Sequence, residues 1–402
     1  MKITPAARTA QCPAGRPLPR GLPAGVPGGS GDRGRIFQTA RYGRITTHQS
    51  LPMARPTPYY PFFDRLFRQS VTVDLGTANT LIYTDDGGIV LNQPSVVCFQ
   101  KEAADRPKRV AAVGTQARQL LGREPANLEA VRPMRHGVIA NFSAAEHMIR
   151  QFVDMARPRP FFSRRAAFTL CVPAGATQVE RRAIREAAAA AGAWKVSLIG
   201  ESLASAVGAG LPVSEATGSM VVDIGGGTTE VGVIALGGMA YNGSIRVGGD
   251  SFDMAIVSYV RNLYGVLLGE QTAEHVKKNI GSAVRDVPRE HMNATGRSVD
   301  DGLPRTVQLS NHDIADAIEG PLRQVIGAVK RGLETAPAEL VTDIANNGIV
   351  LTGGGALLGN LSRRLTSEIG LEVRIADEPL TCAVRGAGMA AAAGLLDELA
   401  YE

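Results

Sequence analysis

The stretch Met220-Val-Val-Asp223-Ile-Gly225-Gly226-Gly227-Thr228-Thr229-Glu230 has a near copy about 150 residues earlier, Val71-Thr-Val-Asp74-Leu-Gly76-Thr77-Ala78-Asn79-Thr80. Each copy is a β-branched run that ends in an aspartate, followed by a turn of small residues and a second apolar run. This pattern predicts a β-hairpin in both places. Glycines let backbone N–H groups close on an anion, and Thr hydroxyls add donors for phosphate oxygens. Two facing hairpins of this kind predict a clamp for a polyphosphate.

The two aspartates, Asp74 and Asp223, occupy matching positions in the copies. A carboxylate beside phosphates suits Mg²⁺, which keeps much of its hydration shell and is usually held through water. An isolated aspartate at a strand end is better interpreted as a turn cap, because short motifs often match by chance. Two matched aspartates in matched contexts reverse that preference and favour a metal site.

A third glycine turn follows the buried strand Gly348-Ile-Val-Leu-Thr352 and consists of Gly353, Gly354, Gly355 and Ala356. A helix that begins behind a glycine turn is a common seat for an anion or a nucleotide. A single turn of this kind is more often structural. Three such turns in one chain, two of them with aspartates, predict a nucleotide site.

These motifs and the segments between them resemble the actin/Hsp70/sugar-kinase superfamily, and within it the MreB family of bacterial actin-like cell-shape proteins. The resemblance runs from about residue 70 to about residue 392. Besides the three turns, it is carried by Gly88-Ile-Val-Leu-Asn-Gln-Pro-Ser-Val96, Arg132-Pro-Met-Arg-His-Gly-Val-Ile-Ala140 and Val179-Glu-Arg-Arg-Ala-Ile184.

The order of strands and helices agrees with what the resemblance implies, an α/β chain of actin-like duplicated ribonuclease-H-like domains with a nucleotide cleft between two lobes. We expect a first lobe over 70–212, a second over 213–382 and a C-terminal helix over 383–402 that packs back on the first lobe. Residues 112–158 are expected to be mostly helical and residues 283–305 irregular. Thr177 and Glu180 have the spacing of a helix capping box.

For the ligands, the resemblance implies ATP and Mg²⁺. Asp74 and Asp223 would hold the hydrated metal, and the loops Gly76, Thr77, Ala78, Asn79 and Gly225, Gly226, Gly227, Thr228 would bind the phosphates. The adenosine would lie against the helix that carries Glu270, Thr272, Ala273, Glu274 and Lys277, with Gly353, Gly354, Gly355 and Ala356 completing the site. The alternative for that helix is an exposed amphipathic helix with i,i+3 and i,i+4 ion pairs.

For catalysis, the resemblance implies that Glu201 orients the water that attacks the γ-phosphate and that Thr228 helps to position it. ATP hydrolysis depends mainly on positioning and charge stabilisation, so a carboxylate that holds a water in line is sufficient. The alternative for Glu201 is a helix N-terminal acid stabilised by the helix dipole. Family members usually have an acid-Glu-Pro triplet, whereas this chain has Gly200-Glu201-Ser202, which leaves the rate of hydrolysis open.

The resemblance implies an ATP-binding, slowly hydrolysing cytoskeletal protein that polymerises into filaments and helps determine cell shape by organising cell-wall synthesis. Its expected partners are further copies of itself and membrane proteins of cell-wall morphogenesis. The alternatives are an Hsp70-like or a sugar-kinase-like ATPase of the same fold. The former would need a substrate-binding domain after the ATPase, and the latter would need acceptor-binding residues.

Composition supports a cytoplasmic globular body behind a basic extension. The chain of 402 residues has a net charge of +5, but residues 1–50 carry eight basic residues against one acidic residue. The rest is therefore close to neutral, which argues against a nucleic-acid partner. Residues 1–52 are rich in Pro, Gly and Arg and are predicted to be disordered. We expect either that Met53 is the physiological start or that residues 1–52 are a dispensable tail. Cys98 and Cys171 lie in apolar runs, which predicts buried thiols.

The chain has no apolar run of the ~18 residues that a membrane span needs, yet two segments favour a peripheral association with the inner membrane. Residues 53–69 form an amphipathic segment with Phe62, Phe63 and Phe67 on one helical face. Phe161 and Phe162 lie among four arginines in a turn. Aromatic side chains at the acyl boundary with arginines at anionic headgroups would give weak binding. The alternative for the first segment is packing on the folded body.

Overall fold

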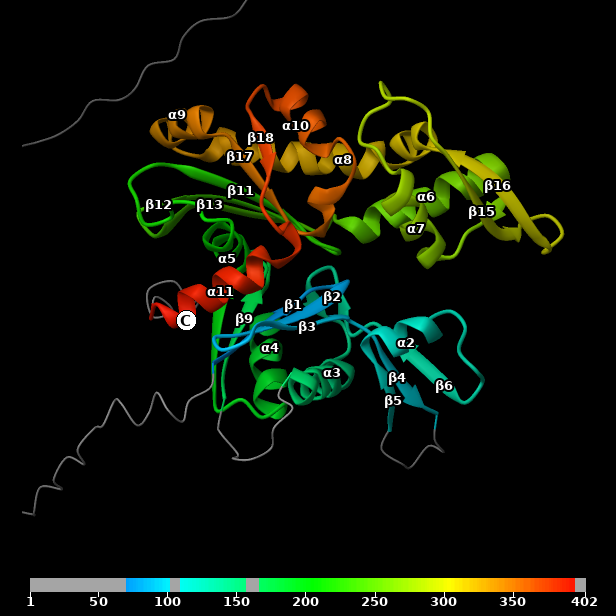
Figure 1. Ribbon diagram of the computed structural model, residues 1–402, viewed down its shortest axis with the longest axis horizontal. Helices are drawn as coiled ribbons and strands as arrows, with labels where there is room; N and C mark the ends of the chain where they lie inside the picture. The colour runs from blue at the N-terminus through cyan, green and yellow to red at the C-terminus, as the bar shows by residue number, and fades with distance from the viewer. Residues whose placement is uncertain (1–69, 102–108, 157–165, 395–402) are drawn as a thin grey trace, which may run out of the picture. The chain divides into compact units, whose positions relative to one another are not determined.

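Two five-stranded sheets with the same topology form the framework of the computed structural model, which describes residues 70–101, 109–156 and 166–394 (Figure 1). The first sheet has the order β10-β9-β1-β2-β3 and the second has the order β13-β12-β11-β17-β18. The strands of the first sheet are β1 (Ser70–Leu75), β2 (Asn79–Thr84), β3 (Gly88–Pro94), β9 (Ala167–Val172) and β10 (Lys195–Gly200). Those of the second are β11 (Ser219–Ile224), β12 (Thr229–Ala235), β13 (Gly238–Ile245), β17 (Ile349–Thr352) and β18 (Val373–Ile375).

In each sheet the first three strands form an antiparallel meander, and the last two run parallel to the first strand. The duplication expected from the paired hairpins is therefore confirmed at the level of strand order and direction. We call the sheet that begins with β1 and its attached elements the first lobe, and the sheet that begins with β11 and its attached elements the second lobe.

The first lobe packs its sheet against α3 (Phe142–Ala156) and α4 (Gln178–Ala190). Phe152 and Ile184 from these helices are fully buried with strand residues such as Val73 and Phe168. The capping box at the start of α4 is confirmed, because Glu180 N donates to Thr177 Oγ1 at 3.2 Å and Thr177 N donates to the Glu180 carboxylate at 2.7 Å.

The expectation that residues 112–158 are mostly helical is wrong for the first part of that range. A small sheet of β4 (Val97–Gln100), β5 (Val110–Val113) and β6 (Leu128–Val131) lies beside α2 (Gly114–Leu120), and a short hairpin of β7 (Met134–Arg135) and β8 (Val138–Ile139) follows. Residues 128–131 form a strand because they pair with β4, which lies about 30 residues earlier. Such a non-local partner overrides local propensity.

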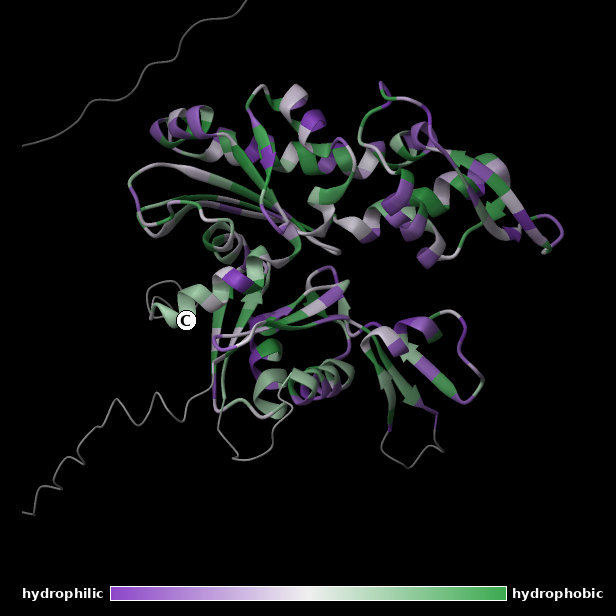
Figure 2. Ribbon diagram, viewed as in Figure 1, coloured by the Kyte–Doolittle hydropathy of each residue, from purple (hydrophilic) through white to green (hydrophobic). Residues whose placement is uncertain are grey.

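The second lobe buries its sheet under α8 (Asn311–Thr335), α9 (Ala338–Asn347) and α10 (Leu361–Ile369), and Figure 2 shows the apolar residues concentrated along the strands. A smaller part of this lobe consists of α6 (Gly249–Tyr264), α7 (Glu270–Ile280) and a sheet of β14 (Val266–Leu267), β15 (His291–Ser298) and β16 (Pro304–Ser310). The expectation of an irregular 283–305 is thus wrong over β15. Most residues of β15 are polar or small. Only Ala294 and Ser298 are buried, and the other residues of the strand are exposed or half-buried.

Two helices, α5 (Glu201–Gly208) and α11 (Cys382–Ala392), cross at close range between the sheets. Gly208 and Gly386 lie at the crossing, where a Cβ on either would overlap backbone atoms of the facing helix. Alanines of both helices form a buried cluster with Cys171 of β9 and Ile199 of β10. The crossing therefore joins the second lobe to the first through small side chains and backbone contact.

Cys98 and Cys171 are buried as expected. Among residues 70–101, 109–156 and 166–394, no helix is both long enough and apolar enough to span a bilayer. Several sequence-based expectations lie outside the described residues: the extension 1–52, the start at Met53, the membrane contacts through Phe62, Phe63, Phe67, Phe161 and Phe162, and the end of the C-terminal helix beyond residue 394.

Candidate functional site

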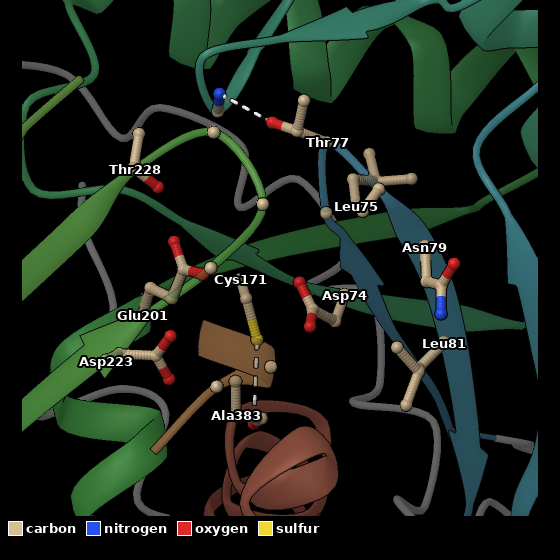
Figure 3. A pocket seen from close by; sticks show the side chains of 18 of the residues that line it. Asp74, Leu75, Thr77, Asn79, Leu81, Cys171, Glu201, Asp223, Thr228 and Ala383 are labelled. Carbon is tan, nitrogen blue, oxygen red and sulfur yellow. Dashed lines mark hydrogen bonds between the residues drawn. The ribbon is translucent and has the colours of Figure 1, made fainter. Parts of the chain in front are cut away.

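One pocket collects the turns of both hairpins, and Figure 3 shows its side chains. From the first lobe it is lined by Asp74, Gly76, Thr77, Ala78 and Asn79, and from the second by Asp223, Gly225, Gly226, Gly227, Thr228, Gly353 and Gly354, together with Glu201 at the start of α5. Residues proposed for three different tasks, namely metal binding, phosphate binding and water orientation, therefore share one cavity.

The strand register makes the two aspartates structural equivalents. Asp74 pairs with Leu81 on β2 and Cys171 on β9, whereas Asp223 pairs with Glu230 on β12 and Thr352 on β17. Both aspartates are thus the penultimate residues of the central strand of their sheets. The same device occurs twice, once on each wall of the pocket.

The two glycine-containing loops lie against each other in the structure. A Cβ on Gly226 would lie 2.8 Å from Ala78 Cβ, and a Cβ on Gly227 would lie 2.8 Å from His136 Cα and would overlap Thr77 Oγ1. Such distances are shorter than ordinary van der Waals contact, so only glycine allows this approach. Thr77 Oγ1 accepts a hydrogen bond from Gly137 N at 2.9 Å, which fixes the first loop to the β7–β8 turn.

Three carboxyl groups point into this pocket from three elements: Asp74, Glu201 and Asp223 (Figure 3). Burial, together with the nearby charge of Asp223, raises the pKa of Asp74 to about 7. Burial also raises the pKa of Asp223 and, well above its usual range, that of Glu201, on which Asp223 and Asp74 act as like charges. The described residues contribute no ion pair to any of the three. Such a cluster has a deficit of positive charge, and a cation would relieve it.

This crowding of buried carboxyl groups predicts that the stability of the folded protein, measured without nucleotide, depends on pH. The folded state holds the Asp74 proton up to about pH 7, whereas the unfolded chain releases it near 3.8. The stability that this proton provides is present at low pH and is lost as pH rises through 7. We expect the stability lost between pH 5 and about 8 to be smaller in Asp74→Asn than in the parent, measured by urea unfolding at each pH. Equal losses in the two proteins would contradict the raised pKa.

Asp223 is held by hydroxyl groups that the sequence analysis did not assign. Ser205 Oγ donates to Asp223 Oδ2 at 2.5 Å and Thr352 Oγ1 donates to the same oxygen at 2.8 Å. Ser205 lies four residues after Glu201 on the same face of α5, so helical spacing is the signal that could have identified it. Thr352 is brought beside Asp223 by the parallel pairing of β17 and β11, which the sequence alone did not specify.

Glu201 is the first residue of α5, and Gly200 precedes it without a side-chain cap. Ser202, the last residue of the Gly200-Glu201-Ser202 triplet, is buried and donates from Oγ to Asn242 Oδ1 on β13 at 2.9 Å. The altered triplet thus leaves Glu201 facing the pocket, and Ser202 ties the beginning of α5 to the second lobe.

Another buried acid, Glu230, joins the lobes and was not singled out as a site residue. It accepts from Ser244 Oγ at 2.6 Å within the second lobe and from Ala174 N at 2.9 Å in the first. Burial raises its pKa to about 7, although both hydrogen bonds act in the opposite direction. Its position corresponds to Leu81 in the first hairpin, so the duplication is not chemically symmetric.

Only part of the third glycine turn, residues 353–356, lines the pocket. Gly353 and Gly354 line the pocket. Gly353 has a φ of +78°, and a Cβ on it would lie 2.6 Å from Asp223 Oδ1. Gly355 packs against Ile224, and Ala356 is fully buried in the core of the second lobe. Only the first two residues of the turn are therefore placed to meet a ligand directly.

The residues of α7 do not line this pocket. Glu270 and Glu274 line a second cavity, Thr272 lines a third, and Ala273 is fully buried in the core. Lys277 Nζ contacts Asp253 Oδ1 at 2.8 Å and Gly249 O at 2.9 Å. Because Gly249 N in turn donates to Gly225 O at 2.9 Å, Lys277 supports the second loop through the beginning of α6.

Within the described ranges, no group of three or more His, Cys, Asp or Glu residues is arranged to ligate a metal ion directly. Two carboxylates on opposite walls, with backbone N–H groups and hydroxyls between them, are instead a donor set for a hydrated cation that is also bound to an anion.

Comparisons with known proteins agree with this architecture. The family model "MreB/Mbl protein" matches residues 68–395. The cell shape-determining protein MreB of Escherichia coli strain K12 is 53% identical over 328 residues, which cover 82% of this chain and 94% of that protein. The cell shape-determining protein Mbl of Bacillus subtilis strain 168 is 39% identical over 324 residues, or 81% of this chain and 96% of that protein.

Among solved structures, MreB5 of Spiroplasma citri bound to ADP superposes with a TM-score of 0.75 at 32% identity, covering 82% of this chain and 98% of that one. A MamK double helical filament superposes with a TM-score of 0.68 at 20% identity, covering 81% and 99% of the two chains, and supports the fold alone. The duplicated sheets are thus those of the actin-like two-lobe fold, and the chain belongs to the MreB/Mbl family.

Proposed function

We propose that the pocket binds ATP with Mg²⁺ between the two glycine-containing loops. The observation that carries this proposal is the equivalent placement of Asp74 and Asp223 on opposite walls, with both loops between them. Structures of Spiroplasma citri MreB5 contain ADP and AMPPNP, and that protein is 32% identical to this chain. Backbone N–H groups of Gly76–Asn79 and Gly225–Thr228 would bind the phosphates.

The uncompensated acids fit a bound cation. Asp74 and Asp223 would hold Mg²⁺ through its water shell, and the ion would neutralise charge on the phosphates and on these carboxylates. Ser205 and Thr352 would keep the Asp223 carboxylate oriented. The adenosine side is proposed for Gly353, Gly354 and the region of α7 near Lys277.

We further propose that this chain hydrolyses ATP slowly, with Glu201 and Thr228 orienting the attacking water. Glu201 lies in the pocket, and burial, with like charges beside it, keeps its pKa well above the usual range. A carboxyl group in that state is a poor general base, so its contribution would be orientation. This agrees with the expectation of a slow ATPase whose turnover accompanies polymerisation.

Self-association into filaments is the proposed purpose of the nucleotide site, and organisation of cell-wall synthesis for cell shape is the proposed cellular role. The relatives named as cell shape-determining proteins support the cellular role. A head-to-tail interface that does not close into a ring generates an open filament. We therefore expect the purified protein to pellet at high speed with Mg-ATP and to stay in the supernatant without nucleotide. Light scattering that stays monomeric at every protein concentration with Mg-ATP would contradict it.

We also propose that the filaments lie on the inner face of the membrane, through Phe62, Phe63 and Phe67 and through Phe161 and Phe162 with their neighbouring arginines. Each contact is weak, so binding would depend on many subunits acting together. We expect co-sedimentation with anionic liposomes, reduced in Phe161→Ser/Phe162→Ser and weaker on neutral liposomes, because each basic residue near an anionic surface contributes ~1 kcal/mol. Equal binding of the parent and the variant to both lipids would refute this role.

A further inference from the structure

The strands β1, β9 and β10 of the first sheet all begin at one end of the first lobe. Ser70 pairs with Ala167, and Ala167 pairs with Lys195, in parallel register, so the first residues of the three strands lie side by side. The pocket residues Asp74 and Glu201 belong to the opposite end of these strands. A strand of six residues is roughly 20 Å long. We call the end that carries the strand starts the distal end of the first lobe.

The helices α3 and α4 also finish at the distal end, because each of them leads back to a strand start. Arg150 Nη2 on α3 donates to the carbonyl of Ala190, the last residue of α4, at 2.7 Å. Trp194 lies in the turn between α4 and β10, and its backbone N–H donates to the carbonyl of Ala166 at 3.1 Å. The turn that carries Trp194 is therefore joined to the start of β9.

The side chain of Trp194 is a large apolar group at the surface of this end. It is the only tryptophan of the chain and is 41% exposed. Met155, on the last turn of α3, is 51% exposed, and Lys195 and the acid Asp154 are exposed as well. An aromatic side chain with a polar N–H, beside a basic residue, is typical of the boundary between acyl chains and lipid headgroups.

The parts of the chain outside the described ranges leave from the same end. Residues 1–69 join the described chain at Ser70, and residues 157–165 join it at Ala166, which accepts from the N–H of Trp194. Both stretches carry the phenylalanines proposed above to meet the membrane, and 157–165 also contains four arginines. The sequence that leaves the distal end is therefore both aromatic and basic.

An anionic bilayer fits this surface better than a folded protein partner. A stable protein interface buries about 800 Å² on each side, and Trp194 and Met155 are too few to supply the apolar part of such an area. A bilayer accepts single side chains, because contributions from many subunits add along a filament. Lys195 would meet lipid phosphates, which attract basic residues at a membrane surface.

We propose that Trp194 is a membrane contact of the first lobe, with its indole in the headgroup region of an anionic bilayer. Lys195 faces the lipid phosphates, and Met155 adds apolar area at the end of α3. This inference rests on the proposed membrane association and adds to it a contact within the described fold. It also gives the first lobe an orientation, since a contact at the distal end turns the pocket away from the lipid.

The test uses the intrinsic fluorescence of the full chain, which reports Trp194 alone. Protein with Mg-ATP is mixed with vesicles of phosphatidylglycerol or of phosphatidylcholine, each with and without brominated acyl chains, which quench indole emission on contact. We expect phosphatidylglycerol vesicles to shift the emission to shorter wavelength and their brominated form to quench it. Phosphatidylcholine vesicles should have little effect, because attraction to the anionic surface is absent.

Co-sedimentation gives the second readout. We expect Trp194→Ala to weaken binding to phosphatidylglycerol vesicles about tenfold or more, because burial of one large apolar side chain is worth at least that factor for each subunit. Leu263→Ala is the matched control, since Leu263 is 60% exposed on α6 of the second lobe, and it should bind as the parent does. Trp194→Phe/Leu263→Trp moves the fluorophore to that position, where brominated lipid should not quench it.

Unchanged Trp194 emission on phosphatidylglycerol vesicles that pellet with the protein would overturn this contact alone. Protection of Trp194 from iodide before vesicles are added would also overturn it, because another part of the chain would then cover the indole. Equal quenching by both brominated lipids would contradict the dependence on anionic headgroups. If the parent failed to pellet with phosphatidylglycerol vesicles, the proposed membrane association would fall, and this contact with it.

Discussion

Asp223→Asn is expected to weaken Mg-ATP binding by about 10- to 100-fold, the range seen when a group that orients a bound metal is lost. Asparagine keeps the size of the side chain and still accepts from Ser205 and Thr352, so the change removes the charge and little else. Asp74→Asn should have a similar effect, because the two residues occupy equivalent strand positions. Isothermal titration calorimetry measures the affinity of each variant for Mg-ATP and for ATP without Mg²⁺, and the loss of affinity should be larger with Mg²⁺.

The matched control for these variants is Asp86→Asn, on the exposed turn between β2 and β3. It removes the same charge at a distance from the pocket and should leave binding at the parent value. Since burial disfavours the charged form of both pocket aspartates, neither pocket variant should lower the stability of the protein measured without nucleotide. Parent-like Mg-ATP affinity in Asp223→Asn would show that this carboxylate does not serve the metal.

Glu201→Ala should leave Mg-ATP affinity close to that of the parent and slow hydrolysis by about 100-fold, the lower end of what positioned acid–base groups contribute. The physical reason is loss of the acceptor that holds a water in line, without loss of the loops that bind the phosphates. Glu201→Gln separates two roles, because an amide oxygen still accepts a hydrogen bond but takes up no proton. Phosphate release under single-turnover conditions is the measurement.

If Glu201 orients the water, the glutamine variant should retain much of the parent rate. If it removes the proton, both variants should be equally slow. Parent-like hydrolysis in Glu201→Ala would mean that Glu201 is a helix N-terminal acid without a part in the reaction.

The sequence allowed the duplicated fold to be predicted because the decisive signal was local. Asp74 and Asp223 each follow a β-branched run and precede a glycine turn, and strand period and turn chemistry require no partner to be recognised. The capping box of Thr177 and Glu180 was predictable for the same reason. The strands β6 and β15 were missed because their residues are half-buried or polar and become strands through pairing with β4 and β16.

The site was predictable to a similar extent. The loop residues and Glu201 could be brought together by resemblance, whereas Thr352 and Glu230 depend on register across a sheet and on contact between lobes. The assignment of the α7 residues to the adenosine side stays a prediction. Glu274 was assigned to the adenosine pocket, yet its carboxylate faces Arg118 of the other lobe, a partner 156 residues away in the chain.

The most direct test of the nucleotide clamp is a crystal structure of the protein with Mg-AMPPNP. The clamp predicts the β- and γ-phosphates between Gly76–Asn79 and Gly225–Thr228, with a hydrated Mg²⁺ between Asp74 and Asp223 and a water between Glu201 and the γ-phosphate. Nucleotide bound away from these loops, or a pocket that stays without nucleotide at saturating concentrations, would contradict it.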